Sequence, residues 1–162
     1  MGSLKIAVTT AAIVCAAVVV TRASWQQAVD PAALPDGEGK VILFRACSDC
    51  HDLGQVVAKR LTPKQWKDVT GDMITRGVRA EDAEIATLVE FLALNVGHVN
   101  VNKATEAELE KYGGFSAAEA AAIVAARGAG KTFASVDDLK ALPGIDGKTL
   151  DDRLDKIAFK DR

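Results

Sequence analysis

The sequence predicts an all-α protein. Its 162 residues are 49% hydrophobic but only 5% aromatic, and they include four prolines. Apolar residues such as Ile85, Leu88 and Leu92 recur at the spacing of one helix face. The apolar content excludes a disordered chain, and three cysteines are too few for a disulfide-dense scaffold. The formal net charge of -2 excludes a polybasic protein that binds nucleic acid or lipid through bulk charge.

The N-terminal segment, residues 1–23, has the pattern of an export signal. Lys5 precedes an uncharged apolar run at residues 6–20. That run has the length of a signal-peptide core and is shorter than the roughly 20 residues that a spanning helix needs. The alternatives are an uncleaved anchor in the inner membrane and a buried N-terminal helix. The pattern therefore predicts a protein of the periplasm, or otherwise outside the cytoplasm.

Two short helical units follow this segment. Residues 24–35 contain two prolines and no helical stripe, which is typical of a linker. The helical units are residues 36–97 and residues 98–162. An apolar core alone is marginal at about 60 residues, so we expect each unit to be reinforced in some other way.

The first unit contains a haem attachment motif. Cys47-Ser48-Asp49-Cys50-His51 is the C-x-x-C-H signature of a c-type haem. Its two thiols add to the two vinyl groups on neighbouring pyrrole rings, and the adjacent imidazole then faces the iron. A dithiol redox pair would normally follow a strand, which the pattern before Cys47 does not show. A zinc site would need a fourth ligand. The motif predicts one covalently bound haem c, attached through Cys47 and Cys50, with His51 as the proximal iron ligand.

The residues around the motif carry a family resemblance. The segment from Gly39 to Cys47 resembles the first helix of small cytochromes c, in which a glycine and an aromatic residue precede the haem motif. Phe91 resembles the aromatic residue with which the last helix of that family crosses the first. The resemblance covers about Asp36 to Asn95, and it implies a small cytochrome c-like helical domain.

Met73 is the candidate for the sixth iron ligand, because it is the only methionine after the first residue. Thr62 and Pro63 predict the start of its helix, as N-cap and first helical residue. Trp66 and Met73 share one face of that helix. The pattern resembles a compact branch of the cytochrome family with an early methionine ligand. The alternatives are that Met73 is an ordinary core residue, or that His98 is the sixth ligand instead.

Arg60 and Trp66 are candidates for contact with the haem propionates. A guanidinium and an indole N–H can both donate hydrogen bonds to a carboxylate. A solvated arginine and a core tryptophan are the alternative interpretations of these two residues.

The second unit contains an internal repeat, because its sequence matches itself when it is shifted by 30 positions, so that residue 109 aligns with residue 139. Each copy predicts two short helices around a tight turn, and stacking the two pairs would form one core. The pattern resembles the tandem helix-hairpin-helix domain of competence-type bacterial DNA receptors and of DNA repair proteins. The hairpin positions are Gly113, Gly114, Ser116, Gly144 and Asp146.

The hairpins depart from the DNA-binding pattern of that family, in which a second glycine leaves backbone N–H groups free for a phosphate. Ser116 and Asp146 replace that glycine here, and both residues are strong N-caps. Acidic residues also slightly outnumber basic ones from Val99 onward. We therefore expect DNA binding to be weak, and the unit to serve in docking or spacing.

The leading hypothesis is an exported monohaem cytochrome c that carries single electrons between a donor and an acceptor protein. Protein ligands fill both axial positions of the iron in this hypothesis, so we expect no enzyme activity. One alternative is a DNA-binding or polymer-binding helix-hairpin-helix protein with a structural or regulatory haem. Another is a haem sensor or peroxidase, which would need Met73 to be absent from the iron.

Overall fold

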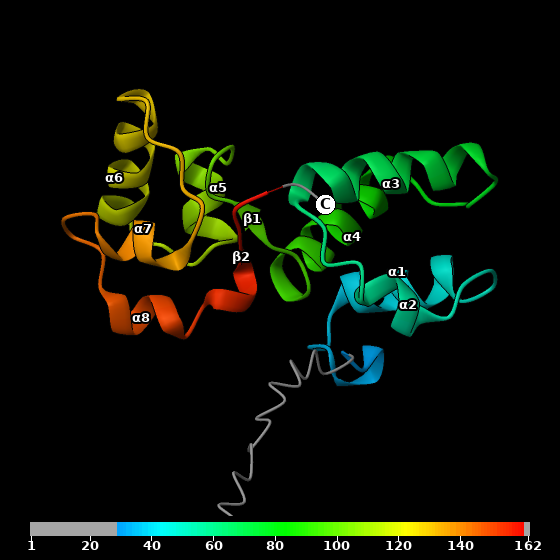
Figure 1. Ribbon diagram of the computed structural model, residues 1–162. Helices are drawn as coiled ribbons and strands as arrows, with labels where there is room; N and C mark the ends of the chain where they lie inside the picture. Colours follow the sequence, from blue (N-terminus) through cyan, green and yellow to red (C-terminus); the bar gives the residue numbers. More distant parts are fainter. Residues whose placement is uncertain (1–28, 161–162) are drawn as a thin grey trace, which may run out of the picture.

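The computed structural model describes residues 29–160 and shows the predicted all-α fold (Figure 1). The expected export signal or anchor, residues 1–23, lies outside the described residues. Two groups of helices lie side by side, joined through a short segment that carries strand β1. In residues 29–160, no helix is long and apolar enough to cross a membrane.

With the described part of the linker included, the first unit spans residues 29–97, and its helix α3 (Pro63–Thr75) begins at a residue that caps it. The Thr62 side chain accepts a hydrogen bond from the Gln65 N–H, and the Gln65 side chain accepts one from the Thr62 N–H at 2.9 Å. This confirms the helix start predicted from the sequence. The elements of this unit are η1 Pro31–Ala33, α1 Glu38–Cys47, α2 Leu53–Val57, α3 Pro63–Thr75 and α4 Asp82–Asn95.

Helix α4 packs against both α1 and α3 and forms the centre of the first unit. It meets α1 at Gly39, where a Cβ atom would lie only 2.3 Å from the Cβ of Phe91. The two helices can approach this closely only because residue 39 has no side chain. Phe91 therefore lies where the last helix of the unit crosses the first, as predicted. The buried apolar residues are Leu34, Ile42, Leu43, Val57, Trp66, Leu88, Leu92, Ala93 and Val96.

The described part of the predicted linker is packed against the first unit. Leu34 is buried in the core, and the Lys40 ammonium donates hydrogen bonds to the carbonyl oxygens of Ala32 and Leu34, both at 2.8 Å. The described part of this segment therefore packs on the helices that follow it. A single apolar side chain produces no helical stripe, so the sequence pattern could not show that Leu34 is an anchor.

The second unit, residues 98–160, contains two helix hairpins that repeat each other. Thr105 and Ser135 each begin the first helix of a hairpin with a capping box, closed by Glu108 and Asp138. These two boxes lie 30 positions apart (105 against 135), which confirms the repeat. The elements are β1 Val99–Asn100, α5 Glu106–Lys111, α6 Ala117–Gly128, α7 Val136–Lys140, α8 Gly147–Asp151, η2 Leu154–Lys156 and β2 Ile157–Ala158.

The two hairpins share one apolar core, as predicted for stacked pairs of short helices. This single cluster draws on both copies of the repeat. Its buried residues are Val99, Val101, Ala104, Leu109, Phe115, Ala120, Ile123, Phe133, Leu139 and Leu150.

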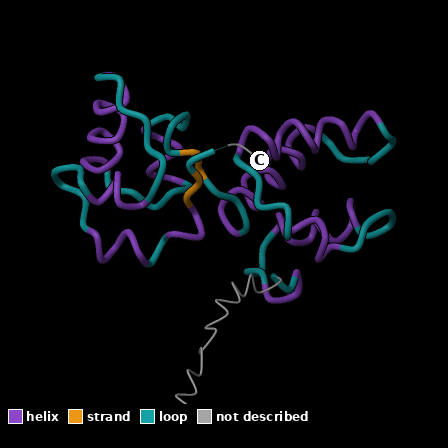
Figure 2. Tube along the Cα trace, in the orientation of Figure 1, coloured by secondary structure: helices purple, strands orange, loops and turns teal. Residues whose placement is uncertain are grey.

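A parallel strand pair closes the second unit. Val99 in β1 pairs with Ile157 in β2, and Figure 2 shows the two strands between the two groups of helices. Beside the pair, the Asn102 amide nitrogen donates to the carbonyl oxygens of Phe133 and Phe159, at 2.8 and 3.0 Å. Strands of two residues are too short to produce an alternating pattern, so the sequence did not predict them.

Candidate functional site

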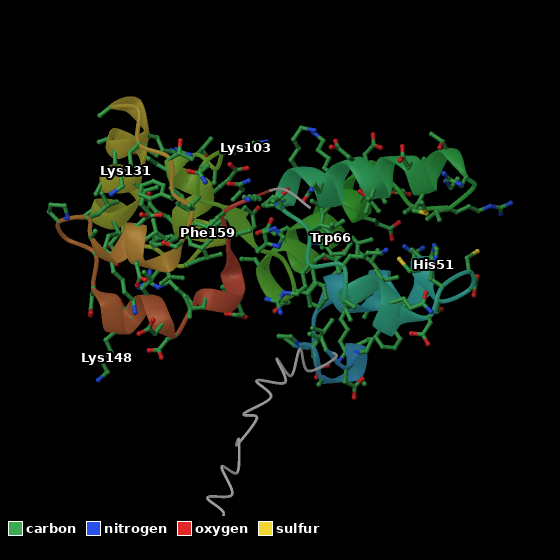
Figure 3. The ribbon with its side chains drawn as sticks, in the orientation of Figure 1. His51, Trp66, Lys103, Lys131, Lys148 and Phe159 are labelled. Atoms are coloured by element: carbon green, nitrogen blue, oxygen red, sulfur yellow. The ribbon has the colours of Figure 1, made fainter. Side chains whose placement is uncertain are left out.

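The three residues of the predicted haem attachment motif, Cys47, Cys50 and His51, lie at the C-terminal end of α1. Cys47 is the last residue of the helix, and the N–H groups of Cys50 and His51 both donate to its carbonyl oxygen, at 3.4 and 3.0 Å. Cys47 is half-buried, whereas Cys50 and His51 are exposed, and neither thiol is in a disulfide. Burial raises the pKa of the Cys47 thiol. Figure 3 shows His51 at the outer end of the first unit.

Helix α3 extends an apolar face beyond the core of the first unit. Trp66, near the start of the helix, is 1% exposed, but Val69 is 39% exposed and Ile74 is 37% exposed. Met73 is partly exposed and belongs to neither apolar core of the described residues. The interpretation of Met73 as an ordinary core residue therefore finds no support in the packing.

The buried indole nitrogen of Trp66 has no hydrogen-bond partner among the described residues. A buried donor left unsatisfied costs about 1–3 kcal/mol. Figure 3 shows Trp66 between the outer end of the first unit and the second unit. The orphaned N–H is the feature of this unit that points most directly to an acceptor outside the polypeptide.

Arg60 contacts the second unit of the protein. Its guanidinium donates a hydrogen bond to the carbonyl oxygen of Asp155 and lies 3.5 Å from the carboxylate of the same residue. The sequence predicted a haem propionate as the partner of Arg60, with a solvated side chain as the alternative. The observed partner is separated from it by most of the chain, so no local sequence pattern indicates this contact.

His98, the rival candidate for the sixth iron ligand, is buried and only 5% exposed. Its backbone N–H donates to the carbonyl oxygen of Leu61 at 3.3 Å, in the joint between the two units. The segment between α4 and β1 that carries His98 lies at the inner side of the first unit, whereas His51 lies at its outer end (Figures 1 and 3). The structure does not bring the two histidines together.

No group of three or more His, Cys, Asp and Glu side chains in residues 29–160 is arranged to hold a metal ion. An iron held by one histidine and one methionine would take only one of its ligands from that set.

The first hairpin of the second unit is closed by its own side chains. Gly114 has a φ of +71°, a left-handed conformation that glycine adopts without strain. Ser116 then caps α6, because its hydroxyl accepts from the Glu119 N–H at 3.3 Å, and the Ser116 N–H donates to the Glu119 carboxylate at 2.8 Å. Ser116 is thus the N-cap that the sequence predicts, and Glu119 completes a capping box with it.

Arg153 covers this hairpin, which the sequence did not indicate. Its guanidinium donates to the carbonyl oxygen of Gly114, lies 3.3 Å from the Glu119 carboxylate and stacks 5.1 Å from the centre of the Phe115 ring. Burial alone would raise the pKa of Glu119, but hydrogen bonds from Ser116 and the charge of Arg153 outweigh it and lower the pKa. Glu119 is thus held as a carboxylate inside the hairpin.

The second hairpin repeats this arrangement more simply. Gly144 has a φ of +87°, and the Asp146 carboxylate accepts from the Lys148 N–H at 2.9 Å. Asp146 therefore caps α8 as predicted, and it places a negative charge where a bound phosphate would need N–H groups.

A groove of about 480 Å³ lies between the two units. It runs between the start of α3 and the segment from β1 to α5, so the residues of the haem attachment motif do not line it. Its lining residues are Thr62, Pro63, Lys64, Gln65, Asp68, Val99, Asn100, Lys103, Ala104 and Glu108.

Comparison with known protein families identifies the second unit. Residues 94–157 match the helix-hairpin-helix motif family, and this range includes both hairpins. No curated protein and no solved structure matches the chain. The second unit is therefore a helix-hairpin-helix domain.

Proposed function

We propose that this protein is a monohaem c-type cytochrome that works outside the cytoplasm and carries single electrons between redox proteins. The observation that carries the proposal is the Cys47-x-x-Cys50-His51 motif at the end of α1, with both thiols free of disulfides and two of its three side chains exposed. The export signal expected in residues 1–23 agrees with it, because c-type haem is attached outside the cytoplasm.

The residues around the motif fit a haem group. Cys47 and Cys50 would hold it by thioether bonds, and His51 and Met73 would bind its iron. The exposed apolar side chains of α3 suit a porphyrin face, and the orphaned Trp66 N–H suits a propionate oxygen. When bound, the haem supplies reversible one-electron transfer. A thioether ligand raises the reduction potential relative to a second histidine.

The role of the chain in this proposal is to hold the haem and to restrict access to its iron. With His51 and Met73 both on the iron, no position remains open for a substrate, and we therefore propose a carrier rather than an enzyme. The helix-hairpin-helix domain would be a docking or spacing element for the redox partners.

An absorption spectrum of the purified protein in alkaline pyridine, before and after reduction, tests the proposal. We expect the band positions of a haem whose two vinyl groups have become thioethers, with about one haem for each chain. If the protein is produced in a host that exports it and attaches c-type haem, a preparation that contains no haem, or contains haem with intact vinyl groups, would reject the proposal.

DNA binding is the second candidate function, and the match of residues 94–157 to the helix-hairpin-helix family is what favours it. The side chains of Ser116 and Asp146, however, occupy N–H groups that a phosphate would need. In the first hairpin, Glu119 adds a charge that is paired with Arg153. These contacts support a function of the domain in docking rather than in DNA binding.

We expect the full-length protein to bind duplex DNA with a Kd weaker than about 10⁻⁴ M at physiological salt, the weak end of non-specific binding. A titration of labelled duplex at two salt concentrations measures this. The double variant Ser116→Gly with Asp146→Gly, which restores the family glycines, is the matched comparison. Micromolar affinity with a steep salt dependence in the unaltered protein would contradict the expectation and favour the second function.

A further inference from the structure

We propose that Arg60 is a positioning residue for the distal side of the haem site. By joining the second unit to the segment that leads into α3, it would fix the helix that carries Met73. This inference rests on the proposed function, and it gives the helix-hairpin-helix domain a role in tuning the haem iron.

The contact joins two parts of the chain that are each firmly held. Asp155 lies in η2, directly before β2, and the pairing of β2 with β1 fixes its position. The Arg60 side chain is 27% exposed, and its guanidinium reaches both the carbonyl oxygen and the carboxylate of Asp155. The hydrogen bond to the carbonyl does not depend on the exposed carboxylate, so the backbone of the second unit holds the guanidinium.

The backbone at Arg60 is strained. Its φ of +48° is the only positive φ of a non-glycine residue in the described part of the chain. A side chain disfavours this left-handed conformation, and such residues persist only where their surroundings hold them. Glycine would meet the backbone requirement better, so the arginine here is explained by its side-chain contact and not by the turn.

The residues after Arg60 transmit this constraint directly to α3. The Leu61 carbonyl accepts from the His98 N–H at 3.3 Å. A Cβ on Gly97 would lie 2.9 Å from the Leu61 oxygen, which shows how closely the two backbone segments pass. Thr62 then begins α3, the helix of Met73. Residues 60–62 are thus held by the second unit and by the segment that follows α4, and a displacement there would move α3 as a rigid element.

The test compares variants of the full-length, haem-loaded protein. Arg60→Ala and Arg60→Gly both remove the guanidinium, while the glycine also relieves the backbone strain. Lys111→Ala is the matched control, because Lys111 forms another ion pair between the units, with Glu90 at 2.8 Å, and does not contact residues 60–62. The readouts are the reduction potential, the sulfur-to-iron band of the oxidised protein in the near infrared, and the affinity of the ferric haem for imidazole.

Both Arg60 variants are expected to have a lower reduction potential and a weaker near-infrared sulfur-to-iron band. Their affinity for imidazole should rise by about threefold to fivefold, the range that loss of one partly exposed contact allows. Arg60→Lys should restore part of the effect, and Lys111→Ala should match the unaltered protein. Haem-loaded Arg60 variants that equal the unaltered protein would overturn the inference and leave the proposed function standing. The inference would also be overturned if Lys111→Ala changed the three readouts as the Arg60 variants do. It would be overturned as well if the unaltered haem-loaded protein lacked the sulfur-to-iron band. Absence of haem from the unaltered protein would instead reject the proposed function.

Discussion

Replacing both Cys47 and Cys50 by alanine is expected to abolish covalent haem attachment and to unfold the first helical unit. The core of that unit contains only nine buried apolar residues within residues 29–97, and a unit of that size is marginal without reinforcement. In our account the haem provides the reinforcement. Haem content after denaturing electrophoresis and thermal unfolding followed by circular dichroism measure the two effects.

The control for this experiment is Asp49→Ala, a change in the spacer of the motif. Asp49 is exposed, so its loss leaves the two thiols and their spacing intact. This variant should keep its haem and its thermal stability. A double cysteine variant that is as stable as the control would show that the first unit folds without the reinforcement.

Met73→Ala is expected to have the second large effect, because it would remove the sixth iron ligand. The near-infrared band of the sulfur-to-iron bond should disappear, and the reduction potential should fall. The open iron position should then bind carbon monoxide in the reduced state and cyanide in the oxidised state. Near-infrared absorption and ligand titrations of the haem-loaded variant measure these changes.

His98→Ala is the comparison for the Met73 experiment. His98 is buried in the joint between the two units, so its replacement should lower stability but leave the band, the potential and the closed iron unchanged. The opposite pattern, in which His98→Ala opens the iron and Met73→Ala does not, would transfer the ligand role to His98.

The features that could be predicted from the sequence are those encoded by neighbouring residues. The N-caps at Thr62 and Ser116 formed as predicted, and each belongs to a capping box with the residue three positions on. The hairpin turns depend on glycine, and Gly114 and Gly144 have the left-handed conformations of such turns. The repeat could also be predicted, because the second unit matches itself at a shift of 30 positions, whereas the Phe91 crossing was implied by the resemblance to small cytochromes c.

The features that could not be predicted depend on contacts between distant segments. Arg60 has its partner in the second unit, and Arg153 closes a hairpin formed by the other copy of the repeat. Neither side chain differs in its local pattern from an ordinary solvated arginine. The burial of His98 likewise follows from how the two units meet. The candidate iron ligands could be identified by residue type, but the residues that position them could not.

The second unit shows how a fold can be identified more firmly than its function. The family match covers residues 94–157, while the cap at Asp146 and the contact of Arg153 with Glu119 occupy groups that a nucleic acid would use. Function depends on the particular groups at a site rather than on the fold that carries them. A docking domain built from a nucleic-acid-binding fold agrees with both observations.

The mass of the unaltered, acid-denatured protein tests the central claim most directly. The protein should be produced with its native N-terminal segment in a host that attaches c-type haem, and then treated with acidic organic solvent to extract any haem that is not covalently bound. We predict a polypeptide that retains the mass of one haem, bound to the peptide that contains Cys47 and Cys50. If the polypeptide has the mass expected without haem and all of the haem is found in the solvent, the proposal of a covalently bound haem is wrong.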